Sequence, residues 1–154
     1  MLNKKELKQL VSLLKKIDKP HEGLPQPVFD ALVKIVPFAA CELAVVNDKG
    51  EFLLTWREDE WYKGWHFPGG LFRFRESFKE RIKQVARKEL GVNITKYKFL
   101  FVKDCSQSQR GHVVSLVYRC EAAKIPKRGQ FFSKMPKNII AGHEELWKMI
   151  KKCK

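Results

Sequence analysis

The chain lacks any long apolar run. No stretch of about 18 apolar residues occurs among its 154 residues, so we expect no helix that spans a membrane. Cysteine is scarce: Cys41, Cys105, Cys120 and Cys153 form neither a CxxC pair nor a Cys/His metal spacing. This indicates a reduced, cytoplasmic protein in which Cys41 and Cys120 fill strand positions. Internal repeats and low-complexity tracts are also absent.

Acidic residues are few, with 17 Asp and Glu against 31 Lys and Arg, which gives a net charge of +14. Such a field favours anionic ligands such as nucleotides, polyphosphates or nucleic acid. Lysines crowd the first 19 residues and the last seven, where they are typical of solvated faces. We therefore expect a nucleotide-type small molecule as partner and no membrane partner. Nucleic acid is an alternative partner, and a homodimer stays open.

The N-terminus differs from the rest of the chain. Residues 3–17 have charges between their apolar positions, which predicts an amphipathic helix and not a signal peptide. Residues 18–27 contain three prolines and a glycine and are typical of a linker. A second short helix is predicted for residues 28–36. We therefore divide the chain into a helical extension, residues 1–36, and a folded domain, residues 37–154.

The domain alternates strand-like and helical segments. Residues 39–46 and 51–56, joined by the turn Asp48-Lys49-Gly50, predict a hairpin. The end of the chain, from His143, suits a helix by propensity. The fold class expected is α/β or α+β, a mixed sheet between helices. Further strands are predicted at residues 94–103 and 113–120, and loops at 56–70 and 124–137.

One helix carries clear boundary signals. Ser77 with Glu80 three residues later is a capping box, and Gly91 is a natural stop. At about 100° per residue, Phe78, Ile82 and Val85 form one buried stripe, and Glu89 falls inside it. A carboxylate there is costly unless it is paired or binds a metal. The alternative is a solvated Glu89 in the last turn.

Other polar residues interrupt apolar surroundings. Glu42 breaks an apolar strand, so it is either functional or paired with a buried arginine such as Arg57. Arg57 suits phosphate recognition, or it neutralises nearby acids. His112 suits a general base, or it makes an ordinary hydrogen bond. Trp61 and Trp65, in an aromatic loop, either stack on a base or fill the core.

The helix and the turn before it, GGLFRFRESFKERIKQVARKELGV (residues 69–92), resemble the Nudix box with most of its acids missing. Gly70, Glu76, Glu89, Gly91 and Val92 fit the pattern. The departures lie between Glu76 and Glu89. They are Gln84 for the box arginine, and Val85 and Lys88 for two box glutamates.

The segment VPFAACELAVVNDKGEFLLTWREDEWYKGWHFPGG is similar to one Nudix branch in particular, the GDP-mannose mannosyl hydrolases. The resemblance implies a Nudix fold with a short last strand near Trp147, and covers about three quarters of the chain. It implies catalytic roles for His112, Glu42 and Arg57. The metal ligands it implies are Glu89 and the carbonyl of Gly69. We add Trp61, Trp65 and Arg73 to Arg57 as expected substrate contacts.

Three positions depart from that branch. Leu71 replaces an arginine, Gln84 the box arginine, and Gly111 a metal-ligand side chain before the histidine. The function expected is hydrolysis of a nucleotide sugar with one Mg²⁺, or Mn²⁺ in its place, and a histidine base. The alternatives are P–O cleavage by an ordinary Nudix diphosphatase, and an inactive Nudix fold that binds nucleotide or RNA.

Overall fold

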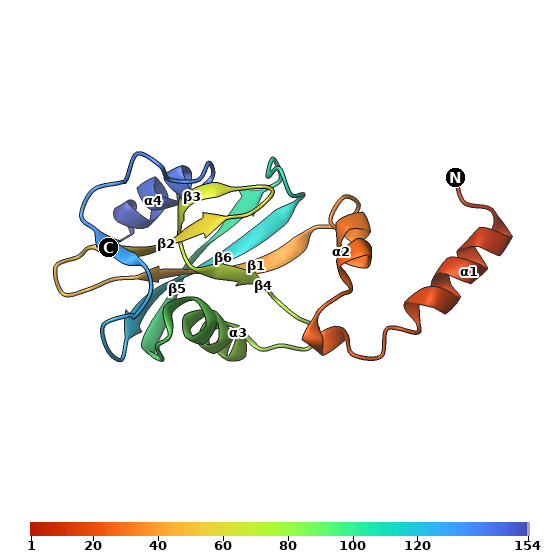
Figure 1. Ribbon diagram of the computed structural model, residues 1–154, viewed down its shortest axis with the longest axis horizontal. Helices are drawn as coiled ribbons and strands as arrows, with labels where there is room; N and C mark the ends of the chain where they lie inside the picture. The colour runs from red at the N-terminus through yellow and green to blue at the C-terminus, as the bar shows by residue number, and fades with distance from the viewer. Residues whose placement is uncertain (154) are drawn as a thin grey trace.

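The computed structural model describes residues 1–153, which form two β-sheets flanked by helices (Figure 1). One sheet has the strand order β4-β1-β6-β5 and the other β3-β2-β7. The strands are β1 (Phe38–Val45), β2 (Phe52–Glu58), β3 (Lys63–His66), β4 (Gly69–Leu71), β5 (Ile94–Cys105), β6 (Val113–Ala122) and β7 (Gln130–Phe132). The helices are α1 (Lys4–Leu14), η1 (Pro20–Glu22), α2 (Gln26–Leu32), α3 (Phe78–Val85), η2 (Ala86–Leu90) and α4 (His143–Lys152).

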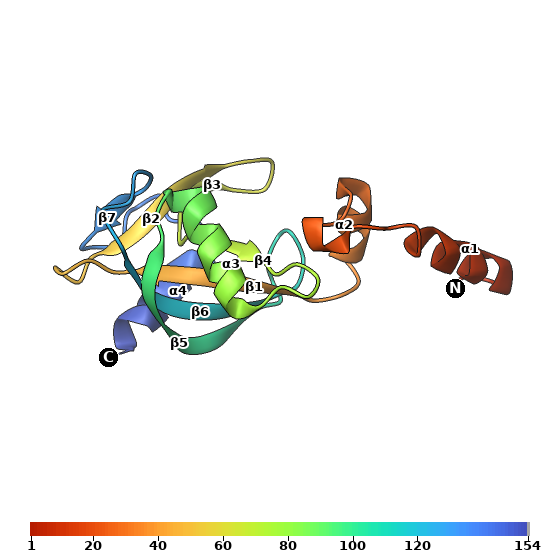
Figure 2. The ribbon, with the colours of Figure 1, turned by 90° about the horizontal axis from the view of Figure 1, so that it is seen from below.

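The first sheet is mixed, because β1 runs parallel to β6 and antiparallel to β4, and β5 pairs antiparallel with β6. Strand β1 is apolar on both faces, which suits its position inside the sheet. Helix α3 lies on one side of this sheet and α4 on the other (Figures 1 and 2). The expected mixed sheet between helices is confirmed.

Two hydrophobic cores separate the faces of β1. Cys41, Leu43 and Val45 pack toward α3 with Ile82 and Leu90, and all of these side chains are buried. The second core holds Ala44 of β1 with residues of β2, β6, α4 and the β3–β4 connection, namely Phe52, Leu54, Val117, Leu146, Trp147, Ile150 and Phe67. Alternation along the strand places Glu42 on the same face as Ala44. The one acid of β1 therefore faces the second sheet and α4.

The predicted hairpin is wrong. Strands β1 and β2 belong to different sheets, and the antiparallel pairing of Val46 with Phe52 is the one β-bridge between their ends in the described structure. The physical reason is that β4 and β6 already occupy both edges of β1, so β2 diverges after the turn. The predicted loops at 56–70 and 124–137 are also wrong in part. The first contains β3 and β4, and the second contains β7, all of them short strands paired to longer ones.

The C-terminus forms helix α4, as propensity predicts, and the short strand implied near Trp147 by the resemblance is wrong. Leu146, Trp147 and Ile150 line one face of α4 and are buried, which is helical and not strand spacing.

The N-terminal elements are shorter than expected, since α1 ends at Leu14 and α2 occupies 26–32 rather than 28–36. Figure 2 shows α1 beyond α2, at one end of the molecule. Within the part of the chain described here, no helix combines the length and the apolar character needed to cross a membrane.

Candidate active site

The helix of residues 78–85 begins and ends as its sequence predicts. The Ser77 hydroxyl accepts from the backbone N–H of Glu80 at 3.3 Å, and the Glu80 carboxylate accepts from that of Ser77 at 2.8 Å. Gly91 ends η2 with φ of 67°, a conformation that favours glycine. Phe78 departs from the predicted buried stripe, because it begins the helix and 56% of it is exposed.

Glu89 lies on η2, a π-helical turn that continues α3. Such turns widen a helix by one residue and are frequent at functional sites. Glu89 is partly buried here and lines the main cavity.

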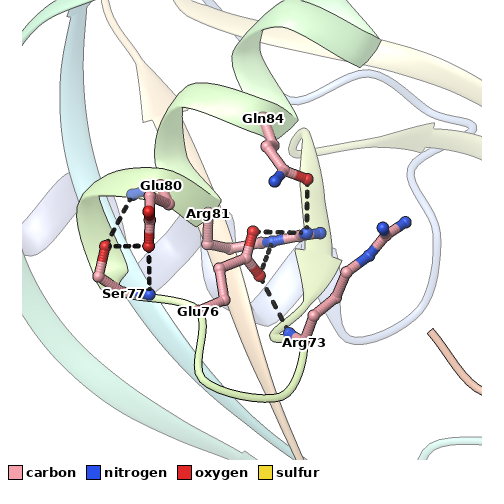
Figure 3. A network of polar contacts seen from close by, with 6 residues as sticks. All are labelled: Arg73, Glu76, Ser77, Glu80, Arg81 and Gln84. Atoms are coloured by element: carbon pink, nitrogen blue, oxygen red, sulfur yellow. Dashed lines mark hydrogen bonds and ion pairs between the residues drawn. The ribbon is translucent and has the colours of Figure 1, made fainter. Parts of the chain in front are cut away.

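The other retained box acid, Glu76, has a structural role. Its carboxylate accepts two hydrogen bonds from Arg81, from Nε at 2.8 Å and from an Nη at 2.9 Å (Figure 3). Gln84 accepts from the same guanidinium at 3.0 Å, and the backbone N–H of Arg73 donates to Glu76 at 3.0 Å. Both members of the ion pair are buried, so they fix the turn to the helix. Glu76 does not line the cavity.

A cavity of about 1210 Å³ lies between the two sheets and the loops around them. Five of the predicted site residues line it: Glu42, Arg57, Trp61, Gly69 and Glu89. The lining holds six basic side chains, Arg57, Lys63, Lys88, Lys103, Arg110 and Arg128, and four carboxyl groups, those of Glu42, Glu89, Asp104 and Glu145. This excess of positive charge suits an anionic ligand.

Glu42 and Gly69 fit tightly against each other. They are cross-strand partners on β1 and β4, and a Cβ added at Gly69 would lie 2.2 Å from Glu42 Oε2. Only glycine leaves this space for the carboxylate. Oε2 of Glu42 is buried and has no hydrogen-bond partner within the described residues. An unpaired buried carboxylate oxygen is a costly feature, which indicates a site for a cation or a proton.

Burial raises the pKa values of both Glu42 and Glu89. Burial, with the neighbouring Glu89, raises the pKa of Glu42 well above its usual range. Burial raises the pKa of Glu89 to about 7, while the N–H of Gly69 and the positive charge of Arg57 oppose this rise. These oxygens are the hard ligands that Mg²⁺ prefers. Within residues 1–153 no three His, Cys, Asp or Glu side chains gather as a metal cluster. The pair therefore fits a cation whose remaining ligands are substrate oxygens and water.

Arg57 lies near these carboxyls but forms its ion pair with Asp59. Its guanidinium also lies over the ring of Tyr62, 5.0 Å from the centroid. The direct pair with Glu42 that the sequence left open is not formed. Trp56, Trp61 and Tyr62 surround Arg57 on the lining, so aromatic faces and a cation meet at one wall of the cavity.

The other three predicted site residues lie off the lining. His112 is half exposed, and its Nε2 lies 3.1 Å from Oδ1 of Asp104, a residue that does line the cavity. Trp65 packs edge-on against Trp56 and Phe132 beside the second core. The Arg73 side chain points away from the Glu76 network and is exposed (Figure 3).

Four polar residues of the lining have no role in the sequence-based prediction. Thr55 Oγ1 lies 3.1 Å from Nε2 of His66, and both residues are buried. His143 Nδ1 accepts from the backbone N–H of Phe67 at 3.2 Å. Burial lowers the pKa of His66 to about 4 and that of His143 to about 3, so both rings are neutral at pH 7. Lys103 is buried and pairs with Glu145 at 2.7 Å.

A signal for these residues existed in the sequence. Lys103 ends a predicted apolar strand, and His66 stands among aromatics just before the paired glycines. Their grouping with Thr55 and His143 still required the tertiary structure, because they come from four separate elements.

The NUDIX domain family model matches residues 37–144. A curated relative, the low-salt glycan biosynthesis protein Agl8 of Haloferax volcanii, is 37% identical over 79 residues, covering 51% of this chain and 50% of that protein. The chain thus matches about half the length of that relative. The MutT NUDIX hydrolase from Burkholderia pseudomallei has a TM-score of 0.64 at 22% identity, with 75% of this chain and 98% of that one covered.

A further solved structure is the NUDIX domain of Shewanella oneidensis NrtR complexed with ADP ribose. It has a TM-score of 0.62 at 15% identity, with coverage of 84% of this chain and 98% of that one. At these identities the likeness to solved structures shows the fold.

Proposed function

Because the chain belongs to the NUDIX domain family, we propose that its cavity hydrolyses a nucleoside diphosphate linked to a sugar. One observation carries the proposal: Glu42 and Glu89 meet beside Gly69, with the cation of Arg57 and the aromatic rings of Trp56 and Trp61 on the adjoining wall. A lone carboxylate pair is too sparse to hold several metal ions. It suits one ion bound together with the diphosphate.

The residues of the cavity have separate tasks in this proposal. Glu42, Glu89 and the carbonyl of Gly69 would hold one Mg²⁺ or Mn²⁺, which would neutralise charge on the leaving diphosphate. Arg57 binds a phosphate oxygen once it is released from Asp59, and its contact with Tyr62 restricts where its guanidinium can move. Trp61 provides a face on which a base can stack. Lys88, in place of a box glutamate, adds positive charge next to Glu89.

Removal of a proton from water is assigned to His112. Asp104 holds one of its ring nitrogens, an arrangement that fixes the tautomer and favours the imidazolium that forms. A neutral imidazole can take the proton of a water that attacks the anomeric carbon of the sugar, where the diphosphate leaves. His112 lies off the lining and contacts Asp104, which is on it, so we place the sugar at the Asp104 side of the cavity.

The deciding experiment is turnover of GDP-mannose in ¹⁸O water with Mg²⁺ present. We expect ¹⁸O in the released mannose and none in the nucleotide, because attack at carbon breaks the sugar–oxygen bond. Label in phosphate would replace this mechanism with P–O cleavage. A thermal-shift screen of nucleotides with and without Mg²⁺ accompanies it. Metal-independent, salt-sensitive stabilisation by RNA alone would favour the binding module.

Matched variants assign the roles. His112→Ala should lower kcat by at least about 100-fold with little change in nucleotide affinity, which is the scale of general-base catalysis. His21→Ala removes an exposed histidine of η1 that lies off the cavity and serves as its control. Glu89→Gln should weaken both turnover and metal-dependent binding, whereas Glu60→Gln should change neither. An unchanged rate in His112→Ala would remove this histidine from the mechanism.

A further inference from the structure

Helix α1 has an apolar face that nothing in the described structure covers. Every residue from Met1 to Lys16 is exposed, and α1 has no buried residue. Figures 1 and 2 agree in placing α1 at one end of the molecule, separated from the sheets by η1 and α2. The helix is nevertheless well defined, because Asn3 caps it: Asn3 Oδ1 accepts from the N–H groups of Lys5 and Glu6 at 2.9 Å and 3.0 Å.

The apolar and basic residues of α1 occupy different faces, and Leu13 is the one apolar residue of the helix outside the main stripe. At about 100° per residue, Leu7, Leu10, Val11 and Leu14 fall within one stripe about 100° wide. The lysines lie on one flank of this stripe and opposite it. Six lysines stand against Glu6 and Asp18 in residues 1–19, namely Lys4, Lys5, Lys8, Lys15, Lys16 and Lys19. This excess of positive charge is not neutralised within the segment. In the described structure one of its lysines, Lys19, forms an ion pair with a carboxylate, that of Glu22.

We propose that α1 binds the surface of a membrane that contains anionic phospholipids. A helix with one apolar stripe and a lysine-rich polar face lies in the interfacial plane, with its leucines among the acyl chains and its lysines at the headgroups. Charge selects this occupant over a second copy of the chain. Pairing two α1 helices brings two lysine-rich segments together, whereas an anionic surface supplies the opposite charge.

Such binding departs from the sequence-based expectation of no membrane partner. The chain contains no long apolar run, but surface attachment needs only one apolar face. The attachment also has a consequence for the cavity. Phe29 and Val33, in and just after α2, line the cavity, and Phe29 packs against Phe38 at the start of β1. The segment that follows α1 is thus joined to the cavity wall, so the attached protein holds its cavity close to the membrane.

Co-sedimentation of the full chain with vesicles tests the proposal. The probes are pure phosphatidylcholine vesicles and vesicles of equal parts phosphatidylcholine and phosphatidylglycerol. We expect partitioning to be at least about tenfold stronger on the anionic vesicles and to weaken as salt rises. Equal partitioning on both vesicles, or none on either, would overturn the proposal.

Paired variants isolate the two faces of α1. Leu10→Asp with Leu14→Asp should abolish binding, while Gln9→Asp with Ser12→Asp makes the same charge change on the polar face and should retain most of it. Lys8→Gln with Lys15→Gln should reduce binding more than Lys134→Gln with Lys137→Gln on the body. Since α1 buries nothing, and Lys134 and Lys137 are exposed, the unfolding temperature of the body should be the same in all four variants.

Two outcomes contradict the proposal directly. The first is that the Leu10→Asp and Leu14→Asp protein binds anionic vesicles as strongly as its charge-matched control. The second is a dimer in sedimentation equilibrium that these two substitutions dissociate, which would make a second copy the occupant of the apolar face. Neither outcome bears on hydrolysis, so the proposed activity is tested separately.

Discussion

The pH dependence of stability is the most direct test of the carboxylate pair. Burial raises the pKa of Glu89 from 4.5 to about 7 and moves that of Glu42 in the same direction. The folded state therefore binds more protons than the unfolded state across this window. Stability should be highest below pH 4.5, as far as these two groups are concerned, and should fall as pH rises toward 7.

The size of the stability change follows from the pKa shift of Glu89. A shift from 4.5 to about 7 corresponds to about 3 kcal/mol. Partial exposure of Glu89 screens its charge, so we expect an effect of about 2 kcal/mol. Glu89→Gln removes the ionisation, and its free energy of unfolding at pH 8 in chelator should exceed that of the unchanged protein by this amount. At pH 5 the difference should be small, because Glu89 is largely protonated there.

The measurement is urea unfolding at pH 5 and pH 8, with chelator and with Mg²⁺. Glu60→Gln makes the same chemical change on the exposed turn at residues 59–62 and should leave the pH dependence unaltered. If Glu89→Gln is no more stable than the unchanged protein at pH 8 in chelator, the argument from burial is wrong. Mg²⁺ added together with a nucleoside diphosphate should recover stability at pH 8 in the unchanged protein and not in Glu89→Gln, since ligand binding to the folded state stabilises it.

Three further predictions concern the surroundings of this pair. Gly69→Ala should lower the free energy of unfolding by about 1–3 kcal/mol and abolish turnover, because its Cβ would overlap the Glu42 carboxylate. In Gly70→Ala the nearest atom to the new Cβ is the end of the flexible Arg81 side chain at 3.2 Å, so this control should cost less in urea unfolding. Glu76→Gln should lower the free energy of unfolding by about 3 kcal/mol in the same assay, because it leaves the charge of the buried Arg81 guanidinium unpaired. A loss of metal affinity without a loss of stability would contradict the structural role of Glu76. Arg57→Lys should raise KM for a nucleoside diphosphate substrate by about tenfold in steady-state kinetics, since lysine cannot reproduce the bidentate contact that a guanidinium makes with phosphate. An unchanged KM would leave Arg57 with its Asp59 ion pair as its one role.

Local signals determined the helix of the Nudix box. The capping box at Ser77 and the left-handed stop at Gly91 depend on neighbours within a few residues, so the sequence contains all that is needed to place them. The apolar spacing of residues 146–150 determined α4 in the same way, against the strand implied by the family resemblance. The Nudix family, and with it the mixed sheet between helices, also followed from the sequence, because the box and its strand context are contiguous.

Tertiary structure decided which strands share a sheet and which polar groups share the cavity. The hairpin failed because β4 and β6, distant from each other in sequence, occupy both edges of β1. Glu42 was recognisable as an acid in an apolar strand, but its contact with Gly69 depends on the register between β1 and β4. Strand pairing and packing across the two sheets keep Arg73 away from the cavity. They also bring Thr55, His66 and His143 together on the cavity wall. These contacts join residues far apart along the chain, and no local pattern specifies them.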